Sequence, residues 1–186
     1  MPRVLVPLAP GCEELEAVTI VDLLRRADIE VVTAGLQDGP VRASRGTVLV
    51  PDTDLDQALG QEYDMIVLPG GMPGMENLKK DGRILSLLRT MAEQGKYTAA
   101  ICASPVVLAE AGLLRGRSAT GYPGFLEDLG LEDVRLSEDP VVRDGKVITS
   151  RGPGTAMDFS LELVEVLSGR EVRDKVEAGL QRPREV

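Results

Sequence analysis

The sequence predicts an α/β sandwich with a largely parallel central sheet and one or two antiparallel additions. Short apolar runs alternate with helical segments along the chain, an order that is typical of parallel sheets covered by helices. One run, Met65-Ile66-Val67-Leu68, is apolar at every position, as expected of a strand buried on both faces. A length of 186 residues suits one domain, so we expect a single domain over residues 1–186.

The first half of the chain predicts three strands, a long helix, two short extended segments and a short helix. Residues 4–8, 30–34 and 65–68 are the strand-like runs. Over residues 13–27, apolar residues recur at helical spacing, and the acidic residues of the first turn suit the positive end of the helix dipole. Two extended segments flank Ser44-Arg45-Gly46 and predict either a hairpin or a pair of short extended pieces, and a short helix over 55–59 follows.

The second half continues the alternation. An amphipathic helix over 83–94 is closed by Gly95, and residues 98–101 are the next strand. Pro105 opens a helix over 105–111, because proline is favoured at the first helical position. The remaining predicted elements are a strand or loop around Ser118, a short helix after Gly121-Tyr122-Pro123-Gly124, a hairpin around Asp144-Gly145, and helices over 155–167 and 171–179.

Charge and composition exclude several classes of function. Thirty acidic and 21 basic residues give a net charge of −9, which repels nucleic-acid backbones and anionic membranes. Three Tyr, two Phe and no Trp leave few rings to stack on bases. With two cysteines and no long apolar run or leader, the sequence predicts a cytoplasmic protein without a disulfide framework.

The chain contains no histidine. This excludes Ser-His-Asp and Cys-His catalysis within one chain and removes the commonest transition-metal ligand. No paired spacing of cysteines and acids indicates a metal site, and we predict neither a metal nor a cofactor. Any general base must therefore be a carboxylate, tyrosine, lysine or water.

Cys102 lies where a strand is predicted to turn into the helix that begins at Pro105. The unpaired N–H groups of a new helix favour a thiolate, so we expect the pKa of Cys102 to lie below the free value of about 8.5. Cys102 is then a nucleophile or redox centre. The local pattern fits a small buried residue equally well, because free cysteine is often buried.

Glu16, Gly71 and Cys102 each follow a predicted strand. Ligands of such sheets bind beyond the carboxyl ends of the strands, so these residues are expected to converge there. This convergence favours the functional interpretation of Cys102. We expect a thiolate beside Glu16 to raise the pKa of that carboxyl, so that Glu16 can donate and shuttle a proton.

Five segments spread along the chain form one combined pattern: Gly11-Cys12-Glu13-Glu14-Leu15-Glu16, Ala43-Ser44-Arg45, Val67-Leu68-Pro69-Gly70-Gly71, Ala100-Ile101-Cys102-Ala103 and Thr149-Ser150-Arg151-Gly152-Pro153-Gly154-Thr155. Together they resemble the ThiJ/PfpI family, which includes Parkinsonism-associated protein deglycases and glyoxalase III-like proteins. The resemblance implies a flavodoxin-like three-layer sandwich, as in class I glutamine amidotransferases, and a homodimer. It further implies a reactive Cys102, a partner carboxyl at Glu16, and an oxyanion site from the backbone of Gly71 and Ala103.

One departure from the family concerns Tyr122, which stands before a proline where many members have histidine. Because the proteolytic branch depends on a Cys-His pair, proteolysis is not expected. Tyr122 is a poor base at neutral pH but is able to donate a hydrogen bond. Arg45 and Tyr122 are candidate ligand or dimer contacts, and Cys12 is a candidate resolving thiol, although each also fits an ordinary loop position.

Two main hypotheses for the function follow. The first is a cysteine-dependent enzyme acting on reactive dicarbonyls such as methylglyoxal, or on early glycation adducts, with Cys102 as nucleophile and Glu16 as acid and base. The second is a stress-protective redox sensor that works through oxidation of Cys102 with little turnover. A third hypothesis is a chaperone-like or binding scaffold, which stays open because Tyr122 replaces the usual histidine. We favour the enzyme.

Overall fold

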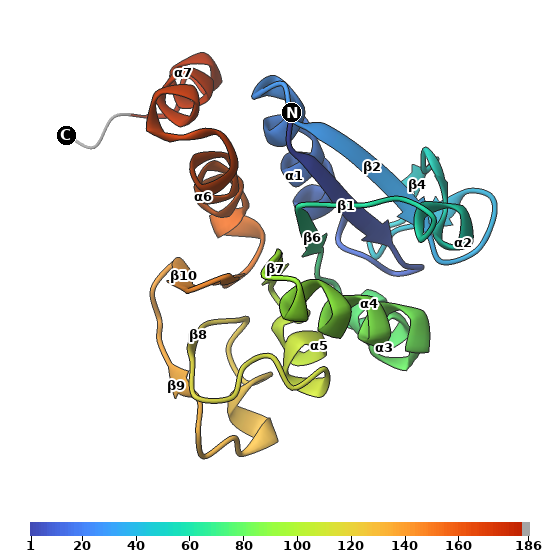
Figure 1. Ribbon diagram of the computed structural model, residues 1–186, viewed down its shortest axis with the longest axis vertical. Coiled ribbons are helices and arrows are strands. Elements are labelled where there is room, and N and C mark those ends of the chain that lie inside the picture. Colours follow the sequence, from blue (N-terminus) through green and yellow to red (C-terminus); the bar gives the residue numbers. More distant parts are fainter. Residues whose placement is uncertain (184–186) are drawn as a thin grey trace.

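The computed structural model describes residues 1–183, and its centre is a seven-stranded sheet in the order β10, β11, β7, β6, β1, β2, β5 (Figure 1). All neighbours run parallel except β10, which is antiparallel to β11. The strands are β1 (Arg3–Leu8), β2 (Glu30–Gly35), β5 (Thr53–Asp54), β6 (Met65–Leu68), β7 (Tyr97–Ile101), β10 (Val141–Asp144) and β11 (Val147–Ser150). The largely parallel sheet predicted from the sequence is confirmed.

Helices cover both faces of this sheet. One face carries α1 (Glu14–Arg26) and α6 (Ala156–Ser168), with α7 (Arg170–Leu180) packed on α6. The opposite face carries α2 (Leu55–Ala58), α3 (Met72–Lys80), α4 (Gly82–Glu93) and α5 (Pro105–Glu110). The smaller elements are the hairpin β3 (Val41–Arg42) and β4 (Val48–Leu49), the parallel pair β8 (Ser118–Ala119) and β9 (Arg135–Leu136), and the 3-10 turns η1 (Glu127–Leu129) and η2 (Pro153–Thr155).

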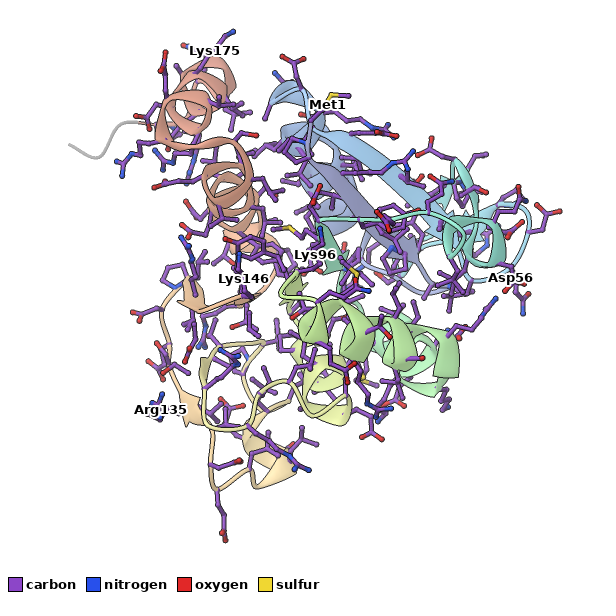
Figure 2. All side chains as sticks on the ribbon, in the orientation of Figure 1. Met1, Asp56, Lys96, Arg135, Lys146 and Lys175 are labelled. Carbon is purple, nitrogen blue, oxygen red and sulfur yellow. The ribbon has the colours of Figure 1, made fainter. Side chains whose placement is uncertain are left out.

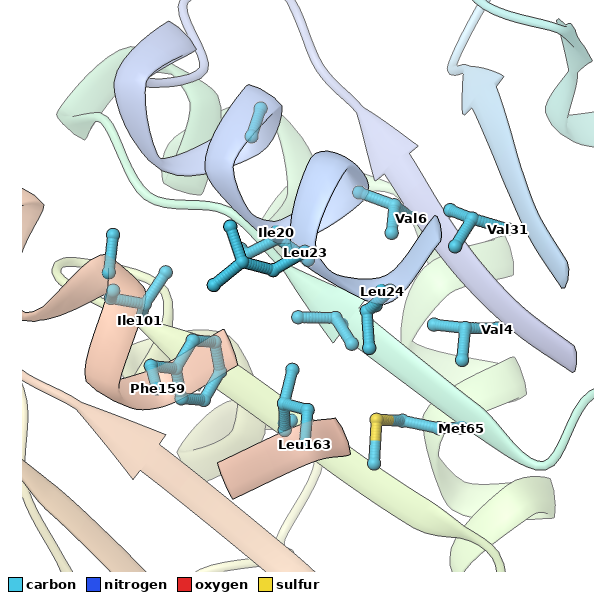
Figure 3. Packing of buried hydrophobic residues seen from close by; sticks show 14 of the residues in the cluster. Val4, Val6, Ile20, Leu23, Leu24, Val31, Met65, Ile101, Phe159 and Leu163 are labelled. Atoms are coloured by element: carbon cyan, nitrogen blue, oxygen red, sulfur yellow. The ribbon is translucent and has the colours of Figure 1, made fainter. Parts of the chain in front are cut away.

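The core is divided between the two faces by the alternation of the strands. Val4 and Val6 of β1 face the helices α1 and α6, whereas Leu5 faces the other layer. Figure 3 shows Phe159 of α6 and Ile20 of α1 packed over the same strands, and both are fully buried. Because both of its faces are covered, the central strand β6 is apolar at every position.

The polar surface surrounds these layers. Lys175 on α7, Asp56 on α2 and Arg135 on β9 project outward in Figure 2. None of the helices within residues 1–183 has both the length and the apolarity that a membrane crossing requires.

The sequence patterns missed α3. Pro73 and Gly74 in its first turn resemble a loop, yet proline is compatible with the start of a helix. Gly74 allows the helix to pack against the loop after β1, since a Cβ there would lie 2.7 Å from Cys12 Cα. The helix therefore begins directly at the glycine pair that ends the β6 loop.

Candidate functional site

The candidate site lies beyond the carboxyl ends of β1, β6 and β7, which are neighbours in the sheet. β1 leads into α1 on one face, whereas β6 leads into α3 on the other. The two connections diverge at this point, which is where open α/β sheets bind ligands. Glu16, Gly71 and Cys102 follow these three strands, and the structure brings them together.

The backbone of Cys102 has a left-handed conformation, with φ of 65°. A residue with a Cβ seldom adopts this conformation, which costs about 1–3 kcal/mol and is typical of functional turns. Two hydrogen bonds hold it: the N–H of Cys102 donates to the Ser150 carbonyl at 3.0 Å, and its carbonyl accepts from the Tyr122 N–H at 2.8 Å. The turn thereby presents a partly buried thiol at the end of β7.

Glu16 lies in the first turn of α1 and is completely buried. Its Oε2 atom accepts a hydrogen bond of 2.8 Å from the N–H of Gly70. Its Oε1 atom has no N–H or O–H partner within the described chain, and the carboxyl's other interaction is with the Cys102 thiol. The arrangement therefore pairs a buried acid directly with the cysteine.

Gly70 and Gly71 allow this approach. A Cβ at Gly70 would lie 2.5 Å from Cys102 Cβ and 2.6 Å from Glu16 Oε2. Gly71 has φ of 88°, and a Cβ there would collide with the Gly11 carbonyl oxygen and lie 2.8 Å from the Glu13 nitrogen. Only glycine fits both positions without displacing the site.

Burial raises the pKa of Glu16 to about 7, partly opposed by the hydrogen bonds from Gly70 and Cys102. Burial also raises the pKa of Cys102 to about 12, and the negative charge of ionised Glu16 acts in the same direction. The backbone N–H groups of Gly71 and Ala103 face the sulfur and lower its pKa. Glu16 and Cys102 titrate as a pair. The pair loses its first proton near pH 7 and its second proton at a much higher pH.

The predicted depression of the Cys102 pKa was therefore wrong. The N–H groups on which it depended are present, but burial of the sulfur and repulsion from Glu16 outweigh them. The raised pKa predicted for Glu16 is confirmed, with burial rather than a neighbouring thiolate as the main cause.

The other predicted residues lie at different distances from this pair. Tyr122 follows Gly121 on the turn that packs against the Cys102 carbonyl, and its side chain is half exposed. The guanidinium of Arg45 is exposed and lies 3.9 Å from Glu13. Cys12 is buried near the end of the loop between β1 and α1, and burial raises its pKa to about 11, which does not favour it as an attacking thiol.

Three residues that position the site were given no individual role from the sequence, although Gly70 and Ser150 lie in segments that resemble the family. The N–H of Gly70 donates to the Glu16 carboxyl, and the carbonyl of Ser150 accepts from the Cys102 N–H. The buried Ser104 donates from Oγ to the Pro69 carbonyl at 2.5 Å. Ser104 therefore joins the β7 turn to the β6 loop. The glycine pair after β6 was a visible signal, whereas the pairing of Ser104 and Ser150 depends on the sheet order. The described chain contains no cluster of acids, cysteines and histidines that would hold a metal ion.

The pKa of Glu16 predicts a pH dependence of stability. The carboxyl titrates near 4.5 in the unfolded chain and about 7 in the folded one, so the folded state holds the extra proton between these values. The free energy of unfolding should fall by about 2 to 3 kcal/mol from about pH 5 to about pH 8 through this group. Urea unfolding of wild type and Glu16→Gln at both pH values measures the difference. Glutamine still accepts from Gly70, so equal pH slopes in the two proteins would contradict the assignment.

Comparison with known proteins fits this geometry. The family model described as "DJ-1/PfpI family" matches residues 2–166. Protein dj-1beta of Drosophila melanogaster is 44% identical over 177 residues, covering 95% of each chain. The glutathione-independent glyoxalase DJR-1.2 of Caenorhabditis elegans is 37% identical over 169 residues, covering 90% of this chain and 89% of its own. The crystal structure of Drosophila DJ-1beta superposes with a TM-score of 0.94 at 42% identity, covering 98% of this chain and 99% of the other. The chain belongs to the DJ-1/PfpI family.

Proposed function

We propose that this protein is a cysteine-dependent enzyme that converts 2-oxoaldehydes such as methylglyoxal into hydroxy acids, or repairs early glycation adducts of the same chemistry. The observation that carries the proposal is the strained turn of Cys102 beside the buried carboxyl of Glu16. A relative described as a glutathione-independent glyoxalase supports the same chemistry. With its pKa of about 7, Glu16 is suited to accept and return protons at neutral pH.

In the first step, the sulfur of Cys102 attacks the aldehyde carbon while Glu16 accepts the thiol proton. A carbon–sulfur bond forms, and the carbonyl oxygen becomes an oxyanion. The N–H groups of Gly71 and Ala103, which already face the sulfur, are the donors for this oxygen. Glu16 then returns the proton to the oxyanion, giving a neutral hemithioacetal.

In the second step, Glu16 removes the hydrogen from the carbon attached to sulfur and delivers it to the neighbouring carbon. The hydroxyl proton on the first carbon passes to the former ketone oxygen, so that the first oxygen becomes a thioester carbonyl and the former ketone becomes an alcohol. Water then hydrolyses the thioester, which releases lactate from methylglyoxal and restores the thiol. Over the whole reaction, one water molecule is added to the substrate, and no oxidant or cofactor is needed.

The expected result is lactate formation from methylglyoxal by the purified wild-type protein. Cys102→Ala should reduce the rate to background, because no nucleophile remains. Glu16→Gln should lower it by about 100-fold or more, because glutamine cannot move a proton. The wild-type rate should rise with pH through about 7, since the base acts in its ionised form. Product analysis by chromatography at several pH values tests all three.

Cys12→Ala is the matched cysteine control, because Cys12 is buried and carries a raised pKa. It should retain wild-type activity. Turnover that survives Cys102→Ala would refute the mechanism, and absence of lactate with the wild type would refute the proposed function.

A redox role is the second candidate. A solved relative described as "Toxoplasma gondii DJ-1, oxidized" is 41% identical, with a TM-score of 0.92 over 99% of this chain and 100% of the other. Cys102 is the more accessible of the two cysteines, and Glu16, when protonated, is a hydrogen-bond donor for an oxygen added to its sulfur. Oxidation of Cys102 by mild peroxide in a protein that forms no lactate would favour this role.

We also propose that two copies of the chain associate through α1 and the β3–β4 hairpin. Four apolar side chains are about half or more exposed there: Leu15 and Val18 on α1, and Val48 and Val50 on or beside β4. Val18 and Val50 line one shallow cavity of about 480 Å³ between these elements. An exposed apolar patch of this kind is typical of an interface.

Light scattering at micromolar concentration should therefore give twice the chain mass for wild type. Val18→Asp should give a monomer, because it places a charge in the patch. Asp56→Ala, an exposed change on α2, should leave the mass unchanged. A monomeric wild type, or a dimeric Val18→Asp, would contradict the proposed interface.

A further inference from the structure

The ring of Tyr122 contacts Phe125 of its own segment and the segment around Gly152, and both segments hydrogen-bond the Cys102 turn. It meets Phe125 edge to face, with ring centroids 6.1 Å apart and an interplanar angle of 81°. On its other side, a Cβ built at Gly152 would lie 3.3 Å from Tyr122 Cδ2. The ring is therefore fixed by packing, although 47% of Tyr122 is exposed.

The same two segments make the backbone hydrogen bonds of Cys102. Residue 122 itself donates its N–H to the Cys102 carbonyl, and Ser150, two residues before Gly152, accepts the Cys102 N–H. The adjacent Gly121 packs on the Cys102 carbonyl, since a Cβ there would lie 3.2 Å from that oxygen. The Tyr122 ring thus belongs to a segment that hydrogen-bonds the reactive turn, and the residue is about half open to solvent.

We propose that Tyr122 is a specificity-determining residue that favours 2-oxoaldehydes with an aromatic or other flat apolar substituent. The inference rests on the proposed function and names the substrate class of that site. A flat substituent next to the carbonyl would pack on the exposed part of the ring once the carbonyl reaches Cys102. Aromatic pairs gain stability beyond their buried area, in offset or edge-to-face arrangements.

Phenylglyoxal and methylglyoxal are the matched probes, because they share the dicarbonyl and differ in the substituent. The ratio of kcat/KM for phenylglyoxal to that for methylglyoxal should fall about fivefold in Tyr122→Ala. Tyr122→Phe should keep the ratio, because the ring remains. Leu59→Ala is the control, an exposed apolar residue after α2 at the opposite edge of the sheet. An unchanged ratio in Tyr122→Ala would overturn the proposal.

Gly152→Ala provides a second variant that leaves Tyr122 itself intact. Gly152 has φ of 172°, which any residue adopts, so the added methyl acts mainly by pressing on the ring. The ratio should fall in this variant also. A ratio equal to that of wild type would argue against a fixed ring position as the cause.

Alkylation of Cys102 tests the same surface without turnover. The rate with iodoacetanilide relative to iodoacetamide, normalised to free N-acetylcysteine and read at Cys102 by peptide mass, should exceed one in wild type. It should fall about fivefold in Tyr122→Ala. If neither dicarbonyl is consumed, the proposed function fails, and the alkylation ratio still decides the role of Tyr122. An equal ratio in both proteins would refute that role.

Discussion

The hydrogen bond from the Gly70 N–H to the buried carboxyl of Glu16 is the interaction on which the candidate site depends. It joins the first turn of α1 to the loop after β6, and it directs the carboxyl toward the turn after β7. Burying an acid without a partner is costly, so this donor is needed to keep Glu16 inside the protein. A side chain at position 70 would occupy the space that the carboxyl and Cys102 share.

The strained backbone of Cys102 is supported from three directions. Ser150 comes from the end of β11, Tyr122 from the turn before η1, and Ser104 ties the helix side of the turn to Pro69. These bonds oppose a conformational cost of about 1–3 kcal/mol. The sheet order β11, β7, β6 makes this possible, because it places the three strand ends side by side. The position of the thiol is thus a property of the whole sheet.

Much of the architecture could be predicted from local patterns. The buried run at β6, the Pro105 start of α5 and the Asp144-Gly145 turn each depend on nearby residues, and each prediction was confirmed. α3 was missed because Pro73 and Gly74 have the local appearance of a loop, and its helix is favoured by packing against Cys12.

The site was predicted in its location but not in its electrostatics. Rules of strand order are enough to bring Glu16, Gly71 and Cys102 to one edge. The direction in which the Cys102 pKa shifts depends on how deeply the sulfur is buried and on how close the Glu16 carboxyl lies. Neither quantity follows from the spacing of residues in the sequence. Pairings such as Ser150 with Cys102 cross 48 positions of the chain and require the sheet order.

The central claim is that the Glu16–Cys102 pair loses its first proton near pH 7 and shares the remaining proton above that pH. The rate of Cys102 alkylation by iodoacetamide against pH, in wild type and Glu16→Gln, tests it most directly, because glutamine preserves the shape and the acceptor for Gly70. The account predicts a rise in reactivity near pH 7 in wild type. In Glu16→Gln that step should disappear, and reactivity should rise only above the free-thiol value of about 8.5, because burial of the sulfur remains. Identical curves for the two proteins would contradict the shared proton.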